Sequence, residues 1–294
     1  MAIIVLAVAG LCFGSFVNAL VWRLHQQEPK TKNQKPKTKK SKLSAKDFQL
    51  RTQQNLSILR GRSICPKCGH ELAIPDLVPV FSWLILRGHC RYCKKPISRQ
   101  YPVVEVVMTA VFAASYYWWP GGVNTGADWL VLVTWLAASV GLLALAVYDF
   151  KWMLLPNKIL YPTAAVAFGG KLAEILLFSE NKAHSWGLLA LSLFMSSGIF
   201  WVLFEISKGK WIGFGDVRLG LITGTLLATP VKSLLMIFLA SFLGVVASLP
   251  ALAGSRAKFL KHRLPYGPFL IAATAVLVLF GDGIINWYKA LTGY

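Results

Sequence analysis

Long hydrophobic runs separated by short polar segments dominate the pattern of this chain. Several runs are near 20 residues, the length that an α-helix needs to cross a bilayer. The pattern therefore predicts an all-α, polytopic membrane protein with about eight transmembrane helices. The expected spans are 2–22, 102–119, 128–148, 159–178, 186–206, 216–229, 231–252 and 265–288, of which 216–229 is the shortest.

Composition and charge agree with this interpretation and orient the chain in the membrane. The 294 residues are 55% hydrophobic and 15% charged, with a formal net charge of +19. Of the 31 Lys and Arg residues, 18 lie in segment 23–101. Nearly all the others lie in or beside every second loop between the expected spans, which is the same side of the membrane as segment 23–101. Because cytoplasmic loops are enriched in Lys and Arg, both termini are predicted outside the cytoplasm and the basic segment inside it. Such a face would attract anionic lipids, and nothing in it requires nucleic acid.

Three parts are expected along the chain: a first transmembrane helix (1–22), a polar cytoplasmic insert (23–101) and a membrane-embedded bundle (102–294). The first helix lacks the basic segment and small-residue cleavage site of a removable signal peptide. The Lys-rich segment 30–44 is predicted to be a mobile, solvated loop, with a lipid or partner contact as the alternative. Segment 73–88 is too short and too interrupted by proline to span, so we expect it at the membrane surface or beneath the bundle.

Four cysteines in the insert have the spacing of a metal site. They form two Cys-x2-Cys pairs separated by 21 residues: Cys65, Cys68, Cys90 and Cys93. Two such pairs suit tetrahedral zinc, and Gly69 and Gly88 would allow the sharp turns that the pairs require. Because four sulfur ligands close the coordination shell, the predicted zinc is structural rather than catalytic. Reduced thiols without metal, or redox pairs, are the alternative; the cytoplasmic side disfavours stable disulfides.

Acidic residues are rare in this chain, which has only 12 Asp and Glu, so those near the membrane need an explanation. Lys171 and Glu174 lie one helical turn apart within a span and are expected to neutralise each other. Glu105, just inside a span, has no evident partner and is a tentative cofactor-binding residue. Asp149 ends one span and Asp216 begins another, so the predicted topology places both at the cytoplasmic membrane boundary.

The positions of these two aspartates suggest a chemical role. An Asp that opens a helix is commonly an N-cap, which alone would explain Asp216. A carboxylate at a helix C-terminus opposes the helix dipole, so Asp149 lacks that explanation. Two carboxylates in a poorly solvated cleft can share one proton and act as base and acid in aspartic proteolysis. Gly213 and Gly215 would leave room for an extended substrate backbone.

Several segments, in their order along the chain, resemble the bacterial prepilin peptidases, which are type IV leader peptidases of the GxGD class of membrane aspartic proteases. The resemblance covers nearly the whole chain and includes both Cys-x2-Cys pairs. The other matching segments are GSFVNALVWRL (14–24), DLVPVFSWLILRGHCRYC (76–93), ISRQYPVVE (97–105), YDFKWMLLPN (148–157), GFGDVRLG (213–220) and LPYGPFLIA (264–272).

This resemblance implies a function. Asp149 and Asp216 would be the catalytic pair, and the four cysteines would bind zinc. The implied reaction removes basic leader peptides from type IV prepilin-like membrane precursors, after a glycine, at the cytoplasmic face of the bacterial inner membrane. A second activity, N-methylation of the new N-terminal residue with S-adenosylmethionine, rests on the resemblance alone, because the sequence has no glycine-rich nucleotide loop. The insert is its expected location.

Three further residues are expected to support the substrate cleft. They are Arg218, Tyr266 and Gly267. Arg218 stands where the resembling family often has Lys, and Tyr266 stands where Phe is common before Gly-Pro. Both departures keep the charge or the aromatic character of the position, so they leave the assignment intact.

Three other function classes are compatible with parts of this pattern. A protease of the presenilin or signal-peptide-peptidase type shares the Tyr-Asp and Gly-x-Gly-Asp motifs, but the zinc insert and the LPYGP segment argue against it. A transporter or proton channel could use the carboxylates as a relay, although such groups belong nearer the bilayer midplane. A non-enzymatic assembly protein could use the zinc module for docking, and mutation of either aspartate would then leave its function intact.

Overall fold

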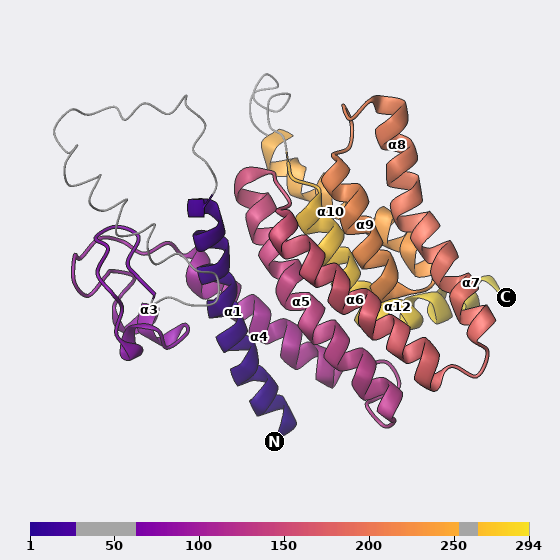
Figure 1. Cartoon of the computed structure of the whole chain (residues 1–294), viewed down its shortest axis with the longest axis horizontal. Helices are drawn as coiled ribbons and strands as arrows, with labels where there is room; N and C mark the ends of the chain where they lie inside the picture. Colours follow the sequence, from indigo (N-terminus) through magenta and orange to yellow (C-terminus); the bar gives the residue numbers. More distant parts are fainter. Residues whose placement is uncertain (28–62, 253–263, 294) are drawn as a thin grey trace. The chain divides into compact units, whose positions relative to one another are not determined.

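The computed structural model describes residues 1–27, 63–252 and 264–293 (Figure 1). Over these residues the chain is all-helical, as predicted, and its only β-type pairings are isolated bridges in the insert. The chain divides into two compact units, Met1–Ala110 and Val111–Tyr294. The Lys-rich segment 30–44, which was predicted to be mobile, lies outside the described residues.

The described helices divide between the two units. The first unit contains α1 (Ala2–Gln27), the 3-10 turn η1 (Ile74–Asp76), α3 (Phe81–Ile85) and the start of α4 (Gln100–Tyr117). The second contains α5 (Gly126–Trp152), α6 (Asn157–Phe178), α7 (Lys182–Leu193), the π-helical segment η2 (Phe194–Gly198), α8 (Ile199–Ser207), α9 (Phe214–Leu227), α10 (Pro230–Leu252) and α12 (Gly267–Thr292). Within it, α5 packs against α6 and α12, and α10 packs against α12 (Figure 1).

Six helical segments in the described part of the chain are long and apolar enough to cross a membrane, which confirms a multi-pass membrane protein. They are α1, α5, α6, the continuous run Lys182–Ser207, α10 and α12. The other two expected spans correspond to α4, with 18 residues, and α9, with 14. A 14-residue helix is about 21 Å long, shorter than a hydrocarbon core of about 30 Å. Thus α9 cannot cross the bilayer by itself, and the count of eight spans is not established.

Close contacts with small residues hold α9 inside the bundle. It packs against α6, α7, η2, α8, α10 and α12. A Cβ atom at Gly220 would lie 3.1 Å from the Cα of Ser197, so the two backbones approach closely. Ser197 Oγ also donates a 2.8 Å hydrogen bond to the carbonyl of Val217, and Ser192 Oγ donates a 2.7 Å bond to that of Gly224. Small residues and interhelical hydrogen bonds are the usual means by which membrane helices associate, and here they set the position of α9.

In the first unit, two glycines bring α1 against α4. A Cβ atom at Gly14 would lie 2.6 Å from the Cα of Glu105, and one at Gly10 would lie 2.7 Å from that of Thr109. One turn further along α1, Asn18 Nδ2 donates a 3.0 Å hydrogen bond to the carbonyl of Tyr101. These contacts explain the glycines at positions 10 and 14, because a larger side chain would separate the two helices.

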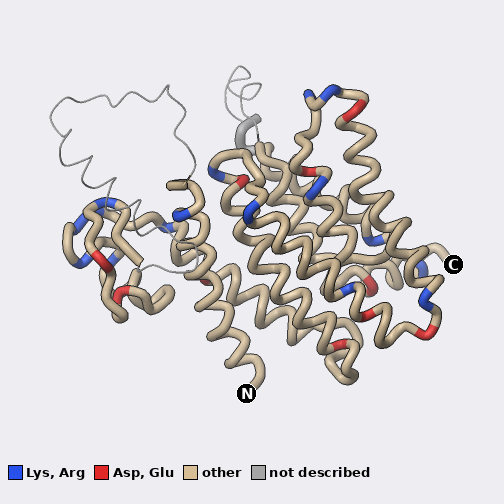
Figure 2. Tube along the Cα trace, viewed as in Figure 1, with Lys and Arg blue, Asp and Glu red and all other residues tan. Residues whose placement is uncertain are grey.

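Charged residues of the second unit lie mostly at the ends of its helices (Figure 2). The predicted pairing inside a span is confirmed, because Lys171 Nζ lies 2.9 Å from Glu174 Oε1 on α6. A second pair, Lys232 and Asp282 at 2.8 Å, joins the start of α10 to α12. Pairing neutralises charges that would otherwise be costly beside lipid.

The alternation of basic loops in the second unit predicts where each loop lies. Reporter tags inserted after residue 121 and in 179–181 are expected on the outer side, because these loops carry few basic residues. Tags in 153–156 and 208–213, beside Lys151, Lys158, Lys208 and Lys210, are expected in the cytoplasm. Accessibility to a membrane-impermeant label in intact cells checks each position. An outer location for the tag in 208–213 would contradict the predicted topology.

Candidate active site and metal centre

Asp149 lies in the last turn of α5 and is buried, with 6% of its surface exposed. The helix ends at Met153, which adopts a left-handed conformation with φ 55° and donates its backbone N–H to the carbonyl of Asp149 at 2.8 Å. That ending turns the chain sharply toward Leu155 and the start of α6. The carboxylate therefore stays at the helix end, where the helix dipole is unfavourable for negative charge.

The N-terminus of α12 compensates for this position. The backbone N–H of Gly267, the first residue of α12, donates a hydrogen bond to the Asp149 carboxylate. A Cβ atom at Gly267 would lie 2.6 Å from Asp149 Oδ2, closer than real Cβ contacts. Only glycine fits here without moving the carboxylate. The start of a helix favours negative charge, so α12 offsets the dipole of α5.

Asp216 lies in the first turn of α9, but it is not the N-cap. Gly213 occupies the N-cap with extended backbone angles, and Asp216 is the third helical residue. Its backbone N–H lies 3.1 Å from the carbonyl of Gly213, and its carboxylate accepts a hydrogen bond from the backbone N–H of the same glycine. The alternative explanation of Asp216 as an N-cap therefore does not apply, since the capping residue directly precedes the helix and is Gly213.

The two aspartates lie close enough for the charge of Asp149 to act on Asp216. They come from different helices, and α12 brings them together because it packs against both α5 and α9. Each carboxylate meets backbone N–H groups at the start of a helix, Gly267 of α12 or Gly213 of α9. Two neighbouring carboxylates oppose each other's ionisation, so the arrangement is suited to sharing one proton.

The other residues predicted to support a substrate cleft have distinct contacts. A Cβ at Gly215 would lie 3.0 Å from Leu155 Cδ1, so this glycine admits close packing of the segment after α5. Arg218 Nη1 donates a 2.8 Å hydrogen bond to Asn157 Oδ1, and its guanidinium lies 4.6 Å from the centre of the Phe214 ring. Arg218 thus ties α9 to the first residue of α6.

Tyr266 precedes α12 and packs edge-on against Phe200, with 5.8 Å between ring centres. Its hydroxyl lies 3.4 Å from Ser241 Oγ and from the carbonyl of Ile237, both on α10. Tyr266 differs from Phe only in this hydroxyl, which contacts Ser241 and Ile237 of α10. It links the start of α12 to α10, so it supports the segment that carries Gly267.

Glu105 lies in the first unit and is buried, with 6% of its surface exposed. Its Oε2 accepts a 2.6 Å hydrogen bond from the backbone N–H of Val80, and Ser15 also donates to this carboxylate. Val80 has a φ of 60°, which is rare for a β-branched residue. The carboxylate thus holds a strained turn of the insert on α4. Sequence reasoning missed this partner because 25 residues separate the two positions.

The four cysteines form one cluster in the insert. Their sulfur atoms all lie within 4.8 Å of one another, so the cluster could hold a metal ion. Four sulfurs around a tetrahedral zinc at about 2.3 Å would be about 3.8 Å apart, which this spacing approaches. Burial acts to raise the pKa of the Cys90 thiol, but hydrogen bonds from the backbone N–H groups of Cys93 and Tyr92 lower it overall. A lowered thiol pKa favours the thiolate that binds metals, whereas burial raises the pKa of the neighbouring Cys65 thiol to about 12.

Each cysteine pair lies on a turn closed by an isolated antiparallel bridge. The bridges join Ile64 to Glu71 and His89 to Pro96. Gly69 has a φ of 73°, as the sharp turn requires. The corresponding residue of the second turn is Lys94, with a φ of 55°. Gly88, with a φ of 71°, lies two residues before Cys90, and its carbonyl accepts a 2.7 Å hydrogen bond from the backbone N–H of Ile97. Both glycines thus adopt the left-handed conformation that a sharp turn requires, Gly69 within the first cysteine turn and Gly88 directly before the second.

Comparison with known proteins gives the family. Residues 8–119 match the model of the bacterial peptidase A24 N-terminal domain, and residues 136–249 match that of the type IV leader peptidase family. A prepilin leader peptidase/N-methyltransferase of Stutzerimonas stutzeri is 30% identical over 96% of this chain and 91% of its own length. The chain belongs to the type IV leader peptidase family. It is therefore an enzyme of a protease family whose curated members are also named as methyltransferases.

Other members of this family agree. Relatives with the same printed name include one from Burkholderia pseudomallei, 31% identical over 93% of this chain and 84% of the relative. Another, from Bacillus subtilis, is 30% identical over 81% of this chain and 89% of the relative. No solved structure matches the chain. Family membership favours the leader-peptidase interpretation over the presenilin-type, transporter and assembly alternatives.

The cysteine cluster predicts how the purified protein binds metal. We expect about one zinc per chain, because four sulfur ligands complete one tetrahedral site. Replacing Cys65 and Cys68 together with Ser is expected to abolish binding, since two remaining thiolates cannot close the shell. Elemental analysis after gel filtration measures both. Cys12→Ser, outside the cluster on α1, is the control. Wild-type protein without bound metal would contradict the prediction.

Proposed function

We propose that this protein cleaves leader peptides from prepilin-like membrane precursors, with Asp149 and Asp216 as the catalytic pair. The observation that carries the proposal is the approach of these two carboxylates, one from α5 and one from α9, at the start of α12. Family membership supports the substrate class, because the relatives are named prepilin leader peptidases. The leader would be the basic segment that such a peptidase removes after a glycine.

The reaction needs one ionised and one protonated carboxyl group. The ionised one takes a proton from water, and the resulting hydroxide attacks the scissile carbonyl carbon. The protonated one donates its proton to the carbonyl oxygen, forming a neutral tetrahedral intermediate. Collapse of that intermediate breaks the C–N bond and delivers a proton to the leaving amine. Backbone N–H groups of Gly267 and Gly213 stabilise negative charge on the carboxylates, and proximity of the pair keeps one protonated.

The active site would face the cytoplasm. Asp149 and Asp216 lie at the same helix ends as Lys151, Lys158 and Arg218, and basic residues mark the cytoplasmic side. If the basic leader of a precursor is held on that side, the hydrophobic segment that follows the leader stays in the bilayer. The scissile bond would then lie at the membrane boundary, where α9 begins.

The insert would contact anionic lipid at the membrane surface. The segment around α3 exposes large apolar side chains, among them Ile74, Phe81, Leu84 and Ile85. Arg87, Lys94 and Lys95 follow it in the sequence. Apolar side chains beside basic ones suit the interface of an anionic leaflet. The hydrogen bond from Val80 to Glu105 supports this location, because it ties the segment to the start of α4.

The names of the relatives also support a second activity, N-methylation of the new N-terminal residue. The methyl donor would be S-adenosylmethionine, and the insert its site. Zinc held by the four cysteines would be structural, because no ligand position stays open for substrate. Glu105 is the candidate cofactor-binding residue, and its carboxylate accepts hydrogen bonds from Val80 and Ser15.

Removing either carboxylate tests the catalytic pair. Asp149→Asn and Asp216→Asn are each expected to lower precursor cleavage by about 10²–10⁴-fold, because base and acid are both needed in each turnover. The double variant is expected to be scarcely worse than either single one. Cleavage by purified protein is measured as the mass change of a prepilin. Asp128→Asn, the same change at the opposite end of α5, is the control and is expected to keep full activity.

Metal content and gel filtration show that each variant is folded. If a folded Asp149 or Asp216 variant still cleaves at more than a tenth of the wild-type rate, the two-aspartate mechanism is wrong. Pre-cleaved substrate offered with S-adenosylmethionine tests the methyltransferase separately, because the aspartates have no part in that step. Methylation by an inactive peptidase variant is the expected result.

The space at Gly267 gives an independent prediction. Gly267→Ala would place a methyl group against Asp149 Oδ2 and move the carboxylate from its position. A displacement of about 1 Å in an active site can lower the rate about 10²-fold, and a loss of that order is expected. Gly283→Ala, on the same helix with open space around it, is the matched control. Equal cleavage rates for the two variants would contradict the importance of the contact.

A further inference from the structure

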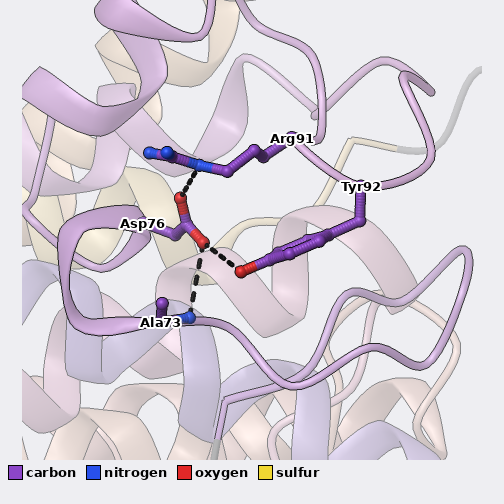
Figure 3. A network of polar contacts seen from close by, with 4 residues as sticks. All are labelled: Ala73, Asp76, Arg91 and Tyr92. Atoms are coloured by element: carbon purple, nitrogen blue, oxygen red, sulfur yellow. Dashed lines mark hydrogen bonds and ion pairs between the residues drawn. The ribbon is translucent and has the colours of Figure 1, made fainter.

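Asp76 is a buried carboxylate in a small, polar part of the chain. Only 3% of its side chain is exposed, although the insert around it is largely solvated. Three groups surround the carboxylate (Figure 3). Arg91 Nε lies 2.8 Å from Oδ1, the Tyr92 hydroxyl donates a 3.1 Å hydrogen bond to Oδ2, and the backbone N–H of Ala73 donates a 3.3 Å bond to Oδ2.

The partners of Asp76 connect the two cysteine turns. Arg91 and Tyr92 are the two residues between Cys90 and Cys93. Asp76 and Ala73 belong to the segment that follows the first pair of cysteines. The carboxylate therefore holds the backbone of the second turn against the chain that leaves the first.

Tyr92 makes a second connection between the turns. Its ring lies against that of His70, with 3.7 Å between the ring centres, and His70 is two residues after Cys68. The hydroxyl of Tyr92 meets Asp76 while its ring meets the first turn. One side chain thus contacts both the first cysteine turn and the segment after it.

We propose that Asp76 is a positioning residue of the metal centre. It contributes no ligand, but through Arg91 and Tyr92 it fixes the second pair of cysteines relative to the first. Side chains that orient metal ligands from outside the coordination shell commonly change metal affinity by about 10–100-fold when they are replaced. Asp76 accordingly sets how slowly the metal leaves. The inference rests on the proposed metal centre, which metal analysis of the wild-type protein tests separately.

The test uses the full-length protein, purified in detergent with zinc bound. Release of zinc to an excess of a chromogenic chelator is followed at neutral pH. Asp76→Asn keeps an oxygen acceptor for Ala73 but loses the charge that faces Arg91, and we expect release about 10–100-fold faster. Tyr92→Phe keeps the ring on His70 and loses only the hydroxyl, so a smaller acceleration, of several-fold, is expected. The double variant is expected to release zinc at least as fast as Asp76→Asn, because the two changes weaken different contacts of one network.

Lys67→Gln is the matched control, since Lys67 lies between Cys65 and Cys68 in the first turn and its side chain is exposed. Its release rate is expected to stay within about twofold of the wild type. Cobalt substitution gives a readout of ligand geometry: the spectrum of four sulfurs around tetrahedral cobalt should persist in Tyr92→Phe. Release at the wild-type rate from both Asp76→Asn and Tyr92→Phe would overturn the proposal. If Asp76→Asn cannot be purified, the rate for Tyr92→Phe decides.

Discussion

The carboxylate of Asp149 meets the first residue of α12 with no side chain between them, and the second unit is built around that contact. A carboxylate at the end of α5 is electrostatically unfavourable, and its surroundings in a membrane bundle solvate it poorly. The N-terminus of α12 supplies the missing donor through the backbone of Gly267. Since the two groups touch, α5 and α12 must keep their relative position for the site to exist.

The second carboxylate depends on a different kind of packing. Asp216 lies at the start of α9, a helix too short to cross the bilayer, which has neighbours on every side. Lipid gives little driving force for helix association, so close approach and buried hydrogen bonds hold such a helix. Close approach occurs at Gly220, and the hydroxyls of Ser192 and Ser197 donate the buried hydrogen bonds. The π-helical segment that carries Ser197 widens the helix locally, a distortion that is frequent near functional sites.

The insert has its own organisation. Its hydrogen bonds and bridges are mostly local and close two turns of similar shape, one with Gly69 and the other with Lys94 in the left-handed conformation. A left-handed conformation costs about 1–2 kcal/mol for a residue other than glycine, and at Lys94 the backbone N–H donates a 2.9 Å hydrogen bond to the carbonyl of Cys90. Glu105 attaches this module to α4 through Val80. The cysteine cluster belongs to the first unit, and the aspartate pair belongs to the second.

The sequence by itself determined the features that depend on local pattern. Hydrophobic runs identified the six long membrane helices, the spacing of the cysteines identified the metal cluster, and the scarcity of acidic residues singled out Asp149 and Asp216. Pairing of Lys171 with Glu174 also followed, because one helical turn separates them. In each case the interacting residues are near in sequence, or their chemistry is rare enough to stand out.

Only the tertiary structure decided how these features work together. The N-terminus of α12 lies against Asp149 although the sequence separates them widely, and no periodicity could have shown that contact. Gly213 rather than Asp216 caps α9, because capping depends on backbone angles that several residues can adopt. Asp76 pairs with Arg91, and Glu105 accepts a hydrogen bond from Val80, although 15 and 25 residues separate the partners. Hydrogen bonds of this kind join groups by position in space, which the order of residues does not specify.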